Sequence, residues 1–492
     1  MNSNSISFIL DNEVFTINWS KSLFPPSTTV LQFLRSIPKH TGTKEGCAEG
    51  DCGACTVVLA ELAPTNDKLI YKAVDACLLF LPALHGKQLI TIENLANKTP
   101  LSTELHPVQQ AIVDNHASQC GYCTPGIAMS IFGLYKSEKK PERKDIIDSL
   151  AGNLCRCTGY GSIIDAAKVA CKTIEQDQFS SNESKIIDAL KTINESKDAI
   201  ELTGKNQIYL IPFSLKQALN FRKIYPDAII VNGSTDIAVR QNKTSEFHQQ
   251  ILDISFVNEL KQIASQKNNF HIGAGCSLED FKQFVHTQFF EFSPIVDHFA
   301  SLQIRHVATI GGNICNASPI GDLIPMLFAL NAQVKIVSSD NERIIYLEDF
   351  ITGYRSINLN NNELTFEIII PEKDNNSFYF AEKISTRRDL DISTLSIATK
   401  LKLSPQGIIE EIKLVYGGLA AKVKRAGSCE EFLIGKHFTS QNLIEASKLI
   451  SNDFTPISDA RSTSEYRLEV AGNLLLKCFY SIHVRMDKNI AL

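Results

Sequence analysis

The feature that most constrains this chain is a concentration of cysteines in its first third. Of its 13 cysteines, eight fall in two groups between residues 47 and 157, and five are scattered over the rest of the sequence. The grouped ones are Cys47, Cys52, Cys55, Cys77, Cys120, Cys123, Cys155 and Cys157. Thirteen core-filling cysteines would be many for an intracellular protein, so the grouping predicts metal ligands. Packing roles are expected of the others, Cys171, Cys276, Cys315, Cys429 and Cys478.

The first group has the ligand order of a plant-type ferredoxin. Cys47-x4-Cys52-x2-Cys55 is followed, after a longer interval, by Cys77. Four thiolates can hold the two irons of a 2Fe-2S cluster, and interspersed glycines let backbone N–H groups turn toward the sulfurs. Structural zinc is the alternative, but it usually uses Cys-x2-Cys knuckles. A disulfide set is not expected in a chain without a secretory signal.

The second group consists of QCGYCTPG at 119–126 and GNLCRCTGYGSI at 152–163. A Cys-x2-Cys pair with a Cys-x-Cys pair fits a zinc site, a redox dithiol or an iron-sulfur cluster, so the spacing alone leaves all three open. The ferredoxin-like group just upstream favours a second redox centre within electron-tunnelling reach.

Composition and charge limit the classes of partner that this chain is expected to bind. The chain of 492 residues is 44% apolar and 21% charged, which is ordinary for a multidomain globular protein. Its formal charge is -5 and the basic residues are interspersed with acidic ones, so we expect no nucleic-acid partner. The sequence shows neither a signal peptide nor a stretch long enough to cross a membrane, and a cytoplasmic location is expected.

Apolar periodicity predicts the secondary structure. Two strands around a turn are expected at 6–18 and another at 56–62, whereas Val108, Ile112 and Val113 predict one face of a helix, and 127–135 continues the helical pattern. The polar segment 173–205 is interpreted as a linker. Strands alternate with helices after it, and a last region from about 376 has three strands followed by helices near 440–450 and 459–483.

The iron-sulfur half is recognisable as a whole. The strings GCAEGDCGACTV, VDACLLFLPALHGK, QCGYCTPG and GNLCRCTGYG closely resemble the xanthine dehydrogenase and aldehyde oxidase family of molybdenum hydroxylases, over residues 6 to about 172. The resemblance implies that the second group also binds a 2Fe-2S cluster, inside a helical domain. It also implies that Gln119 and Cys157 face the molybdopterin of a partner subunit.

The rest of the chain resembles the FAD-binding part of the same family. VNGSTDI at 231–237 is a weak signal alone, but RHVATIGGNICNASPIGDLIPM at 305–326 is rich in glycine and small polar residues, which suits close backbone approach to a ligand. The likeness continues through KISTRRDLDIS at 383–393 and PISDARSTSEYR at 456–467. Asn232 departs from the family, where a second glycine is common, but Asn tolerates positive φ.

The resemblance assigns the flavin contacts residue by residue. Two segments would wrap the diphosphate, and they comprise Ile230, Val231, Asn232, Gly233, Ser234, Thr235, Asp236, Ile237, Thr309, Ile310, Gly311, Gly312 and Asn313. Asp322 would accept hydrogen bonds from ribityl or sugar hydroxyls, and Phe299, Thr365 and Lys383 would line the flavin pocket. A core position for Phe299 and an exposed surface position for Lys383 remain alternatives.

The resemblance implies a fold and an activity. We expect a multidomain α+β protein: a β-grasp plant-type ferredoxin domain at 1–92, an all-α 2Fe-2S domain at 93–172, a linker at 173–205, an α+β FAD-binding domain at 206–375 and an α+β C-terminal flavoprotein domain at 376–492. Electrons would pass from the partner's molybdenum centre through the second and first clusters and FAD to NAD⁺. No catalytic residue for the substrate is expected in this chain.

The partner implied is a separate large subunit of the xanthine dehydrogenase type, which binds the molybdopterin cofactor and hydroxylates hypoxanthine and xanthine in purine catabolism. The pair is expected to form an α2β2 heterotetramer. The alternatives are service to another molybdenum hydroxylase that oxidises aldehydes or N-heterocycles, and oxygen as the final acceptor in place of NAD⁺.

Overall fold

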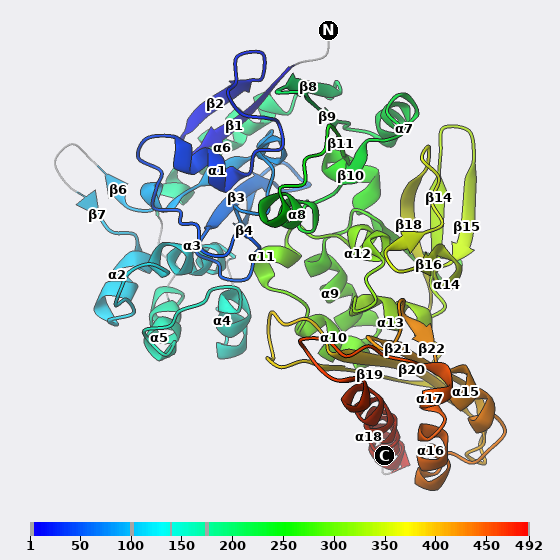
Figure 1. Ribbon diagram of the computed structural model, residues 1–492. Helices are drawn as coiled ribbons and strands as arrows, with labels where there is room; N and C mark the ends of the chain where they lie inside the picture. Colours follow the sequence, from blue (N-terminus) through cyan, green and yellow to red (C-terminus); the bar gives the residue numbers. More distant parts are fainter. Residues whose placement is uncertain (1–3, 99–102, 138–139, 173–176, 491–492) are drawn as a thin grey trace. The chain divides into compact units, whose positions relative to one another are not determined.

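The chain forms two compact units. The computed structural model describes residues 4–98, 103–137, 140–172 and 177–490. The first unit contains the chain up to Asn258 and a short return segment, Ala300–Ala308; the second contains Glu259–Phe299 and everything from Thr309 onward. Both units mix helices with sheets (Figure 1), so the expected multidomain α+β class is confirmed. The unit boundary divides the predicted flavin region 206–375 after residue 258.

The N-terminal sheet has the expected β-grasp arrangement. Its strand order is β2-β1-β5-β3-β4, in which β1 and β5 are parallel and the remaining pairs are antiparallel. The strands are β1 (Ser5–Leu10), β2 (Glu13–Asn18), β3 (Thr56–Leu62), β4 (Leu69–Asp75) and β5 (Gln88–Ile90). Helix α1 (Val30–Ser36) begins at a capping box between Thr29 and Gln32. The predicted hairpin at 6–18 and strand at 56–62 are confirmed.

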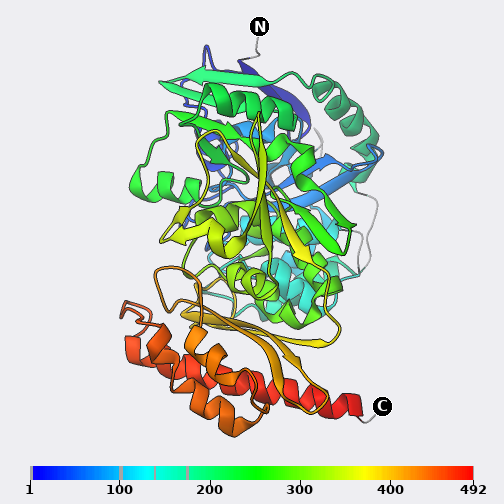
Figure 2. The same cartoon turned by 90° about the vertical axis from the view of Figure 1, so that its right-hand side faces the viewer.

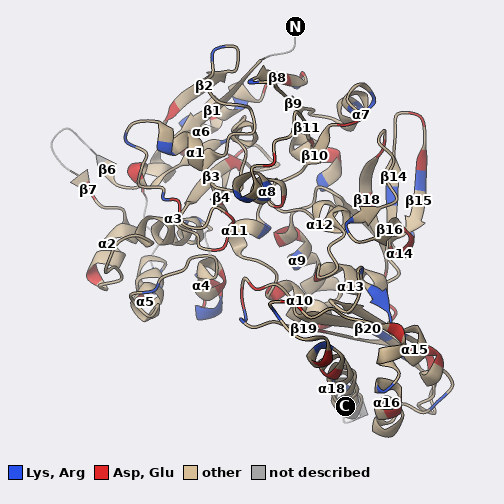
Figure 3. Ribbon diagram, viewed as in Figure 1, with Lys and Arg blue, Asp and Glu red and all other residues tan. Residues whose placement is uncertain are grey.

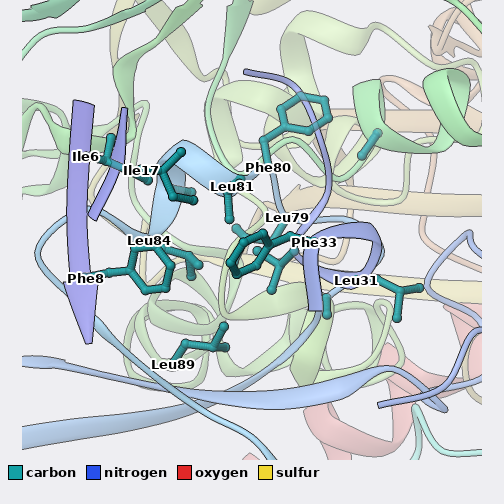
Figure 4. Packing of buried hydrophobic residues seen from close by; sticks show 14 of the residues in the cluster. Ile6, Phe8, Ile17, Leu31, Phe33, Leu79, Phe80, Leu81, Leu84 and Leu89 are labelled. Carbon is teal, nitrogen blue, oxygen red and sulfur yellow. The ribbon is translucent and has the colours of Figure 1, made fainter. Parts of the chain in front are cut away.

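A continuous apolar core fills this part of the first unit. Ile6 and Phe8 alternate inward from β1 and meet Phe33 of α1 and the run of apolar residues at 79–84 (Figure 4). Each fully buried side chain of this size contributes about 1.5–3 kcal/mol. The same core includes Tyr209 and other residues from the next sheet, which explains why the first unit extends beyond the predicted iron-sulfur region.

Helices surround the second cysteine group. They are α2 (Pro107–Asp114), α3 (Thr124–Tyr135), α4 (Arg143–Leu150), α5 (Gly161–Ala170) and α6 (Gln178–Ile193). Val108 and Ile112 of α2 are buried as predicted, but Val113 is 56% exposed. The prediction that Val113 shares their face is wrong, because residues in adjacent positions of a helix are about 100° apart.

The polar segment 173–205 is not an unstructured linker. Helix α6 lies within it and buries Phe179, Ile186 and Ile187 in the helical core, and strand β8 (Ile200–Gly204) follows. Overall polarity concealed an amphipathic helix, whose apolar residues recur at helical spacing. The prediction failed on this point; residues 173–176 themselves lie outside the described part.

Asp177 fixes the start of α6 inside a buried network. Its carboxylate accepts from the Ser180 amide at 2.7 Å, from Lys136 Nζ at 3.2 Å and lies 3.1 Å from His106 Nε2. Burial raises the pKa of Asp177, but the contacts with His106, Ser180 and Lys136 outweigh that effect and hold the pKa below its ordinary value. The network therefore joins α2, α3 and α6 through one ionised carboxylate.

A four-stranded sheet completes the first unit. Its order is β10-β11-β9-β8, with β10, β11 and β9 parallel. Besides β8, its elements are β9 (Gln207–Ile211), α7 (Leu215–Ile224), β10 (Ile229–Val231), α8 (Ile237–Thr244) and β11 (Gln250–Asp253). The return segment supplies the short helix α11 (Leu302–Arg305).

The second unit begins with a five-stranded antiparallel sheet of order β12-β13-β18-β14-β15. Its strands are β12 (Ile263–Gln266), β13 (Asn269–Gly273), β14 (Gln333–Val337), β15 (Glu342–Tyr346) and β18 (Leu364–Pro371). The accompanying helices are α9 (Leu278–Gln288), α10 (Ser293–Asp297), α12 (Ile310–Asn316), α13 (Leu323–Ala329) and α14 (Leu347–Phe350), and β16 (Ile351–Gly353) pairs with β17 (Ser356–Ile357).

The C-terminal region has the predicted three strands followed by helices. An antiparallel sheet is formed by β19 (Ser377–Ile384), β20 (Leu395–Leu403), β21 (Ile409–Gly417) and the short β22 (Lys424–Arg425). The helices are α15 (Gly427–Leu433), α16 (Ser440–Ser447), α17 (Ile450–Asp453) and α18 (Ser464–Ile490). Figure 2 shows these helices, drawn orange to red, against the sheet, where they enclose one core.

Along the elements drawn in Figure 3, Lys and Arg are interspersed with Asp and Glu. Within the described part of the chain, no helix combines the length and apolar character that a membrane crossing requires.

Candidate functional site

The first cysteine group lies in the loop between α1 and β3 and just after β4. Three amides of this loop donate to sulfur: that of Cys47 to Cys52 Sγ at 3.3 Å, and those of Glu49 and Asp51 to Cys47 Sγ at 3.4 and 3.3 Å. Cys55, at the start of β3, and Cys77 are buried. The loop thus turns its N–H groups toward the thiols, as the glycines in it suggested.

The four thiols of this group form two hydrogen-bonded pairs. Cys47 and Cys52 share a hydrogen bond, as do Cys55 and Cys77. The Cys52 thiol, together with the nearby amides, lowers the pKa of Cys47 to about 5, and the thiolate is the form in which cysteine binds a metal. The hydrogen bond to Cys77, followed by burial, raises the pKa of Cys55.

The second group has the same paired arrangement. Cys120 contacts Cys157, and Cys123 contacts Cys155. Among the described residues, no three or more His, Cys, Asp or Glu side chains gather round one point as ligands of a single ion. In a 2Fe-2S cluster each iron takes two protein ligands, so thiols in pairs have the arrangement that a dinuclear cluster needs.

The two pairs of the second group differ in exposure. Cys120 and Cys157 are exposed, together with Gln119, whereas Cys155 is only 9% exposed. Amide hydrogen bonding from Tyr122, followed by the Cys157 thiol, lowers the pKa of Cys120. One edge of this group therefore lies at the surface of the unit and the other lies in the helical core.

Thr158 and Tyr160, which follow the Cys-x-Cys pair in the sequence, form hydrogen bonds with Cys155. The Thr158 hydroxyl lies 3.1 Å from Cys155 Sγ, and the Tyr160 hydroxyl accepts from the Cys155 amide at 2.8 Å. Burial raises the pKa of Cys155, but the hydrogen bonds from Thr158, the Cys157 amide and the Cys123 thiol together outweigh it, and the net shift is downward. Neither residue was singled out from the sequence, although both lie within the TGYG string that carries the resemblance.

The two cysteine groups are directly connected through the backbone. The Leu154 amide, next to Cys155, donates to the carbonyl oxygen of Cys52 at 3.0 Å. Asp75 is a further residue that the sequence did not single out: it is buried, and Cys55 Sγ lies 3.8 Å from its Oδ1. Burial, followed by the charge of Cys47, raises the pKa of Asp75 to about 8.

The predicted diphosphate segment 230–237 forms a tight strand-to-helix turn in the first unit, between β10 and α8. Gly233 has φ of 83°, and a Cβ placed on it would lie 1.8 Å from the carbonyl oxygen of Val307. No side chain fits there, which is the condition that the glycine satisfies. Ser234 is engaged by the protein, since its hydroxyl donates to Leu78 O at 2.6 Å.

The predicted segment 309–313 opens helix α12 in the second unit. Thr309 caps this helix by accepting from the Gly312 amide at 3.1 Å. The amides of Ile310 and Gly311 donate to Cys276 O and Ala274 O, and that of Asn313 donates to Thr309 O. These N–H groups are therefore satisfied within the protein. Within the described residues, Asn313 Oδ1 is buried without a hydrogen-bond partner, which marks a place for a donor.

The other predicted pocket residues also lie in the second unit. Lys383 Nζ donates to Asp322 Oδ2 at 2.8 Å, and the two side chains are only 4% and 7% exposed, so the surface alternative for Lys383 is wrong. Ser393 donates to the other Asp322 oxygen. The Thr365 hydroxyl lies 3.3 Å from Cys315 Sγ, and Phe299 is half-buried.

Three known families match successive parts of the chain. Residues 91–168 match the "[2Fe-2S] binding domain", residues 187–373 the "FAD binding domain in molybdopterin dehydrogenase" and residues 380–482 the "CO dehydrogenase flavoprotein C-terminal domain". The chain is the 2Fe-2S and FAD region of a molybdenum hydroxylase family member. Within that family, this is the electron-transfer region.

The individual relatives of this molybdenum hydroxylase region carry the names of different enzymes. A xanthine dehydrogenase of Oryza sativa subsp. japonica is 31% identical over 94% of this chain, and aldehyde oxidase 2 of Macaca fascicularis is 27% identical over 98%. The chain spans only 38% and 40% of these relatives. A solved carbon monoxide dehydrogenase structure from Hydrogenophaga pseudoflava has the same fold, with a TM-score of 0.52 and 23% identity over 55% of this chain and 94% of that one.

Proposed function

We propose that this chain is the iron-sulfur and FAD subunit of a xanthine dehydrogenase. In this proposal it carries electrons from a molybdopterin-binding partner, which hydroxylates hypoxanthine and xanthine, to NAD⁺. The observation that carries the proposal is that two groups of paired thiols lie in one compact unit and are joined by the Leu154–Cys52 hydrogen bond. Such an arrangement suits two adjacent one-electron centres, and it has no use in a structural zinc protein.

The cysteine sites fit 2Fe-2S clusters on the chemistry of their donors. In the first group, Cys47, Cys52, Cys55 and Cys77 would be the ligands. Amides already point at Cys47 Sγ and Cys52 Sγ, and such hydrogen bonds stabilise a negatively charged cluster and raise its reduction potential. In the second group, the Thr158 hydroxyl would do the same at Cys155.

The flavin segments fit a bound FAD through different groups. At 230–237, Gly233 keeps the turn free of side-chain bulk. At 309–313 the amides are engaged, so contacts with FAD would come from the Asn313 side chain and from the exposed Gly312. Asp322 has already accepted one bond on each oxygen, and each oxygen keeps a second acceptor site for a ribityl or sugar hydroxyl. FAD, when bound, exchanges single electrons with clusters and a hydride with nicotinamide.

The exposed edge of the second group supports a partner on that side. Gln119, Cys120 and Cys157 lie at the surface, where a molybdopterin-bearing subunit can bring its cofactor within electron-transfer reach. The relatives named xanthine dehydrogenase support a purine as the substrate of that partner, whereas the aldehyde oxidase relative supports an aldehyde. The α2β2 assembly, the cytoplasmic location and the acceptor NAD⁺ belong to the first of these possibilities.

Metal and flavin analysis of the purified chain tests the proposal. About four irons, four sulfides and one FAD per chain are expected, as two 2Fe-2S clusters require. Cys155→Ala is expected to lose about half of the iron. Cys171→Ala removes an equally buried thiol near the same helices and is expected to keep all of it. Stoichiometric zinc without sulfide, or equal iron loss in both variants, would refute the cluster assignment.

Assays of the chain purified with its partner separate the remaining possibilities. Xanthine-dependent reduction of NAD⁺ under anaerobic conditions is expected. Turnover with an aldehyde but not with xanthine would assign the chain to an aldehyde-oxidising enzyme instead. Turnover that requires oxygen and leaves NAD⁺ unchanged would make oxygen the acceptor.

A further inference from the structure

Gln303 is a fully buried polar residue at the centre of the first unit, where an apolar side chain would be usual. It lies on α11, and its Nε2 donates to Ser130 Oγ at 2.9 Å, to Ser149 O at 3.0 Å and to Asn153 Oδ1 at 3.1 Å. The amide orientation follows from Ser149 O, which can only accept. One side chain thus ties α11 to α3, to α4 and to the loop before Cys155.

Asn153 extends this contact to the first cysteine group. It is only 2% exposed, and its Nδ2 donates to Gly53 O at 3.0 Å and to Thr56 Oγ1 at 3.2 Å. A Cβ on Gly53 would lie 2.4 Å both from Asn153 Nδ2 and from Gly152 O. The two cysteine-bearing loops therefore meet backbone to backbone, with Asn153 as the side chain that bonds them.

The segment that carries Gln303 is itself anchored. Arg305 is 1% exposed, and its Nη2 donates to both carboxylate oxygens of Asp148 on α4, at 2.9 and 2.8 Å. His306 Nδ1 lies 2.8 Å from Ala73 O of β4. Ala300–Ala308 falls within the region that matches the FAD-binding family, yet it belongs to the first unit. Thr309, which opens the predicted flavin loop, follows directly.

Stability alone does not account for this arrangement. Gln303 Oε1 is buried without a hydrogen-bond partner among the described residues, and an apolar side chain at this position would avoid that cost. A buried polar network is useful when a unique geometry is required, because its directional bonds select one arrangement of the parts.

We propose that Gln303 and Asn153 are positioning residues that fix the separation of the two cluster sites. In this role, a segment of the flavin-binding region holds the loop of Cys52 and Cys55 against the loop of Cys155 and Cys157. The inference rests on the proposed function, because it takes the two cysteine groups to be the cluster sites. Neither residue contacts a ligand thiol through its side chain in the contacts described here, so both act through the loops.

The test uses Gln303→Met in the full chain, a change that keeps the volume and removes the three donated bonds. Gln110→Met is the matched control, since Gln110 is exposed on α2 and its side chain donates to Asp114 Oδ1 within the same helix. Ile187→Ala is a second control, because it creates a cavity under α6 and lowers stability away from the two loops. Each variant is compared with the unsubstituted chain by hydrogen exchange at the Leu154 amide and by electron paramagnetic resonance of the reduced clusters.

Gln303→Met is expected to retain about four irons and to broaden or abolish the spin–spin splitting between the two reduced clusters. Exchange at Leu154 is expected to become about tenfold faster, equivalent to about 1.4 kcal/mol of lost protection. Both controls should keep the exchange rate and the splitting of the unsubstituted chain. Unchanged exchange and splitting in Gln303→Met, or equal changes in Ile187→Ala, would overturn the inference. Absence of clusters from the unsubstituted chain would instead refute the proposed function, and the exchange rates would still decide whether Gln303 positions the loops.

Discussion

The buried ion pair between Lys383 and Asp322 gives a quantitative prediction for the second unit. Lys383→Met keeps the length of the side chain but removes an ammonium that donates to Asp322 Oδ2 at 2.8 Å, to Asp391 O at 2.8 Å and to His298 O at 3.4 Å. The Asp322 carboxylate, whose side chain is 7% exposed, would then be bonded only by Ser393 among these donors. Removing one partner of a buried ion pair lowers the free energy of unfolding by about 3–5 kcal/mol, because the other charge is left uncompensated.

The Ser393 bond places the expected loss at the lower end, about 3 kcal/mol, or roughly 6–12 °C in Tm for a unit of this size. Differential scanning calorimetry and circular dichroism would follow the second unit. Trp19, the single tryptophan, lies in the first unit, so its fluorescence provides an internal reference that should hardly shift. A double variant with Asp322→Leu is expected to lose less than the sum of the two single losses, because it leaves no unpaired charge.

Lys448→Met is the matched control, since the pair of Lys448 with Glu445 is exposed and such pairs contribute at most about 1 kcal/mol. A transition shift in Lys383→Met no larger than that in Lys448→Met would show that burial of the Lys383–Asp322 pair does not make its loss costly. FAD content measured on the same samples would report whether the pair also supports flavin binding.

Three further predictions concern the first unit. Asp177 has a depressed pKa despite burial, so its contribution is fully present above about pH 4 and is lost as the pH falls from there through the folded pKa; Asp177→Asn should lower the Tm at pH 7, and its difference from the unsubstituted chain should shrink steadily as the pH is lowered below about 4. Thr158→Val removes a bond of about 1 kcal/mol to Cys155 Sγ and should lower one cluster potential by roughly 40 mV in a redox titration; an unchanged potential would contradict this. Gly233→Ala should abolish FAD retention, whereas Gly407→Ala, at a positive φ in open space, should leave the FAD content unchanged.

Features that depend on neighbouring residues were predictable. The hairpin at 6–18 and the strand at 56–62 follow from two-residue alternation, which is a property of the local sequence. The strands and helices beyond residue 376 were also anticipated. Helix α6 was missed because the abundance of Ser, Asn and Lys concealed an apolar face that contains only a few of its residues. Its burial is decided by the helices that it meets.

The flavin contacts stay a prediction, and the hydrogen-bond partners of their residues could not be read from the sequence. Lys383 could be interpreted from sequence as a surface charge, and only the fold brings it to Asp322, 61 residues away along the chain. Likewise, the glycines at 311 and 312 indicated close backbone approach to a ligand, and only the fold shows that their amides donate to a carbonyl and a hydroxyl oxygen of the protein. A short motif specifies which residues are present, but the groups that form hydrogen bonds with them come from other parts of the chain.

The sequence by itself determined where the two cysteine groups lie and what metal chemistry they suit, because ligand spacing along a loop is a local property. Only the tertiary structure decided which thiols pair, and that the two loops are bonded through Asn153 and Gln303. Asn153 lies 100 residues from Gly53 and Gln303 lies 150 residues from Asn153 along the chain. Bonds over such separations form only when the chain folds, and their formation costs the conformational entropy of the long loops that they close. No pattern of neighbouring residues encodes them.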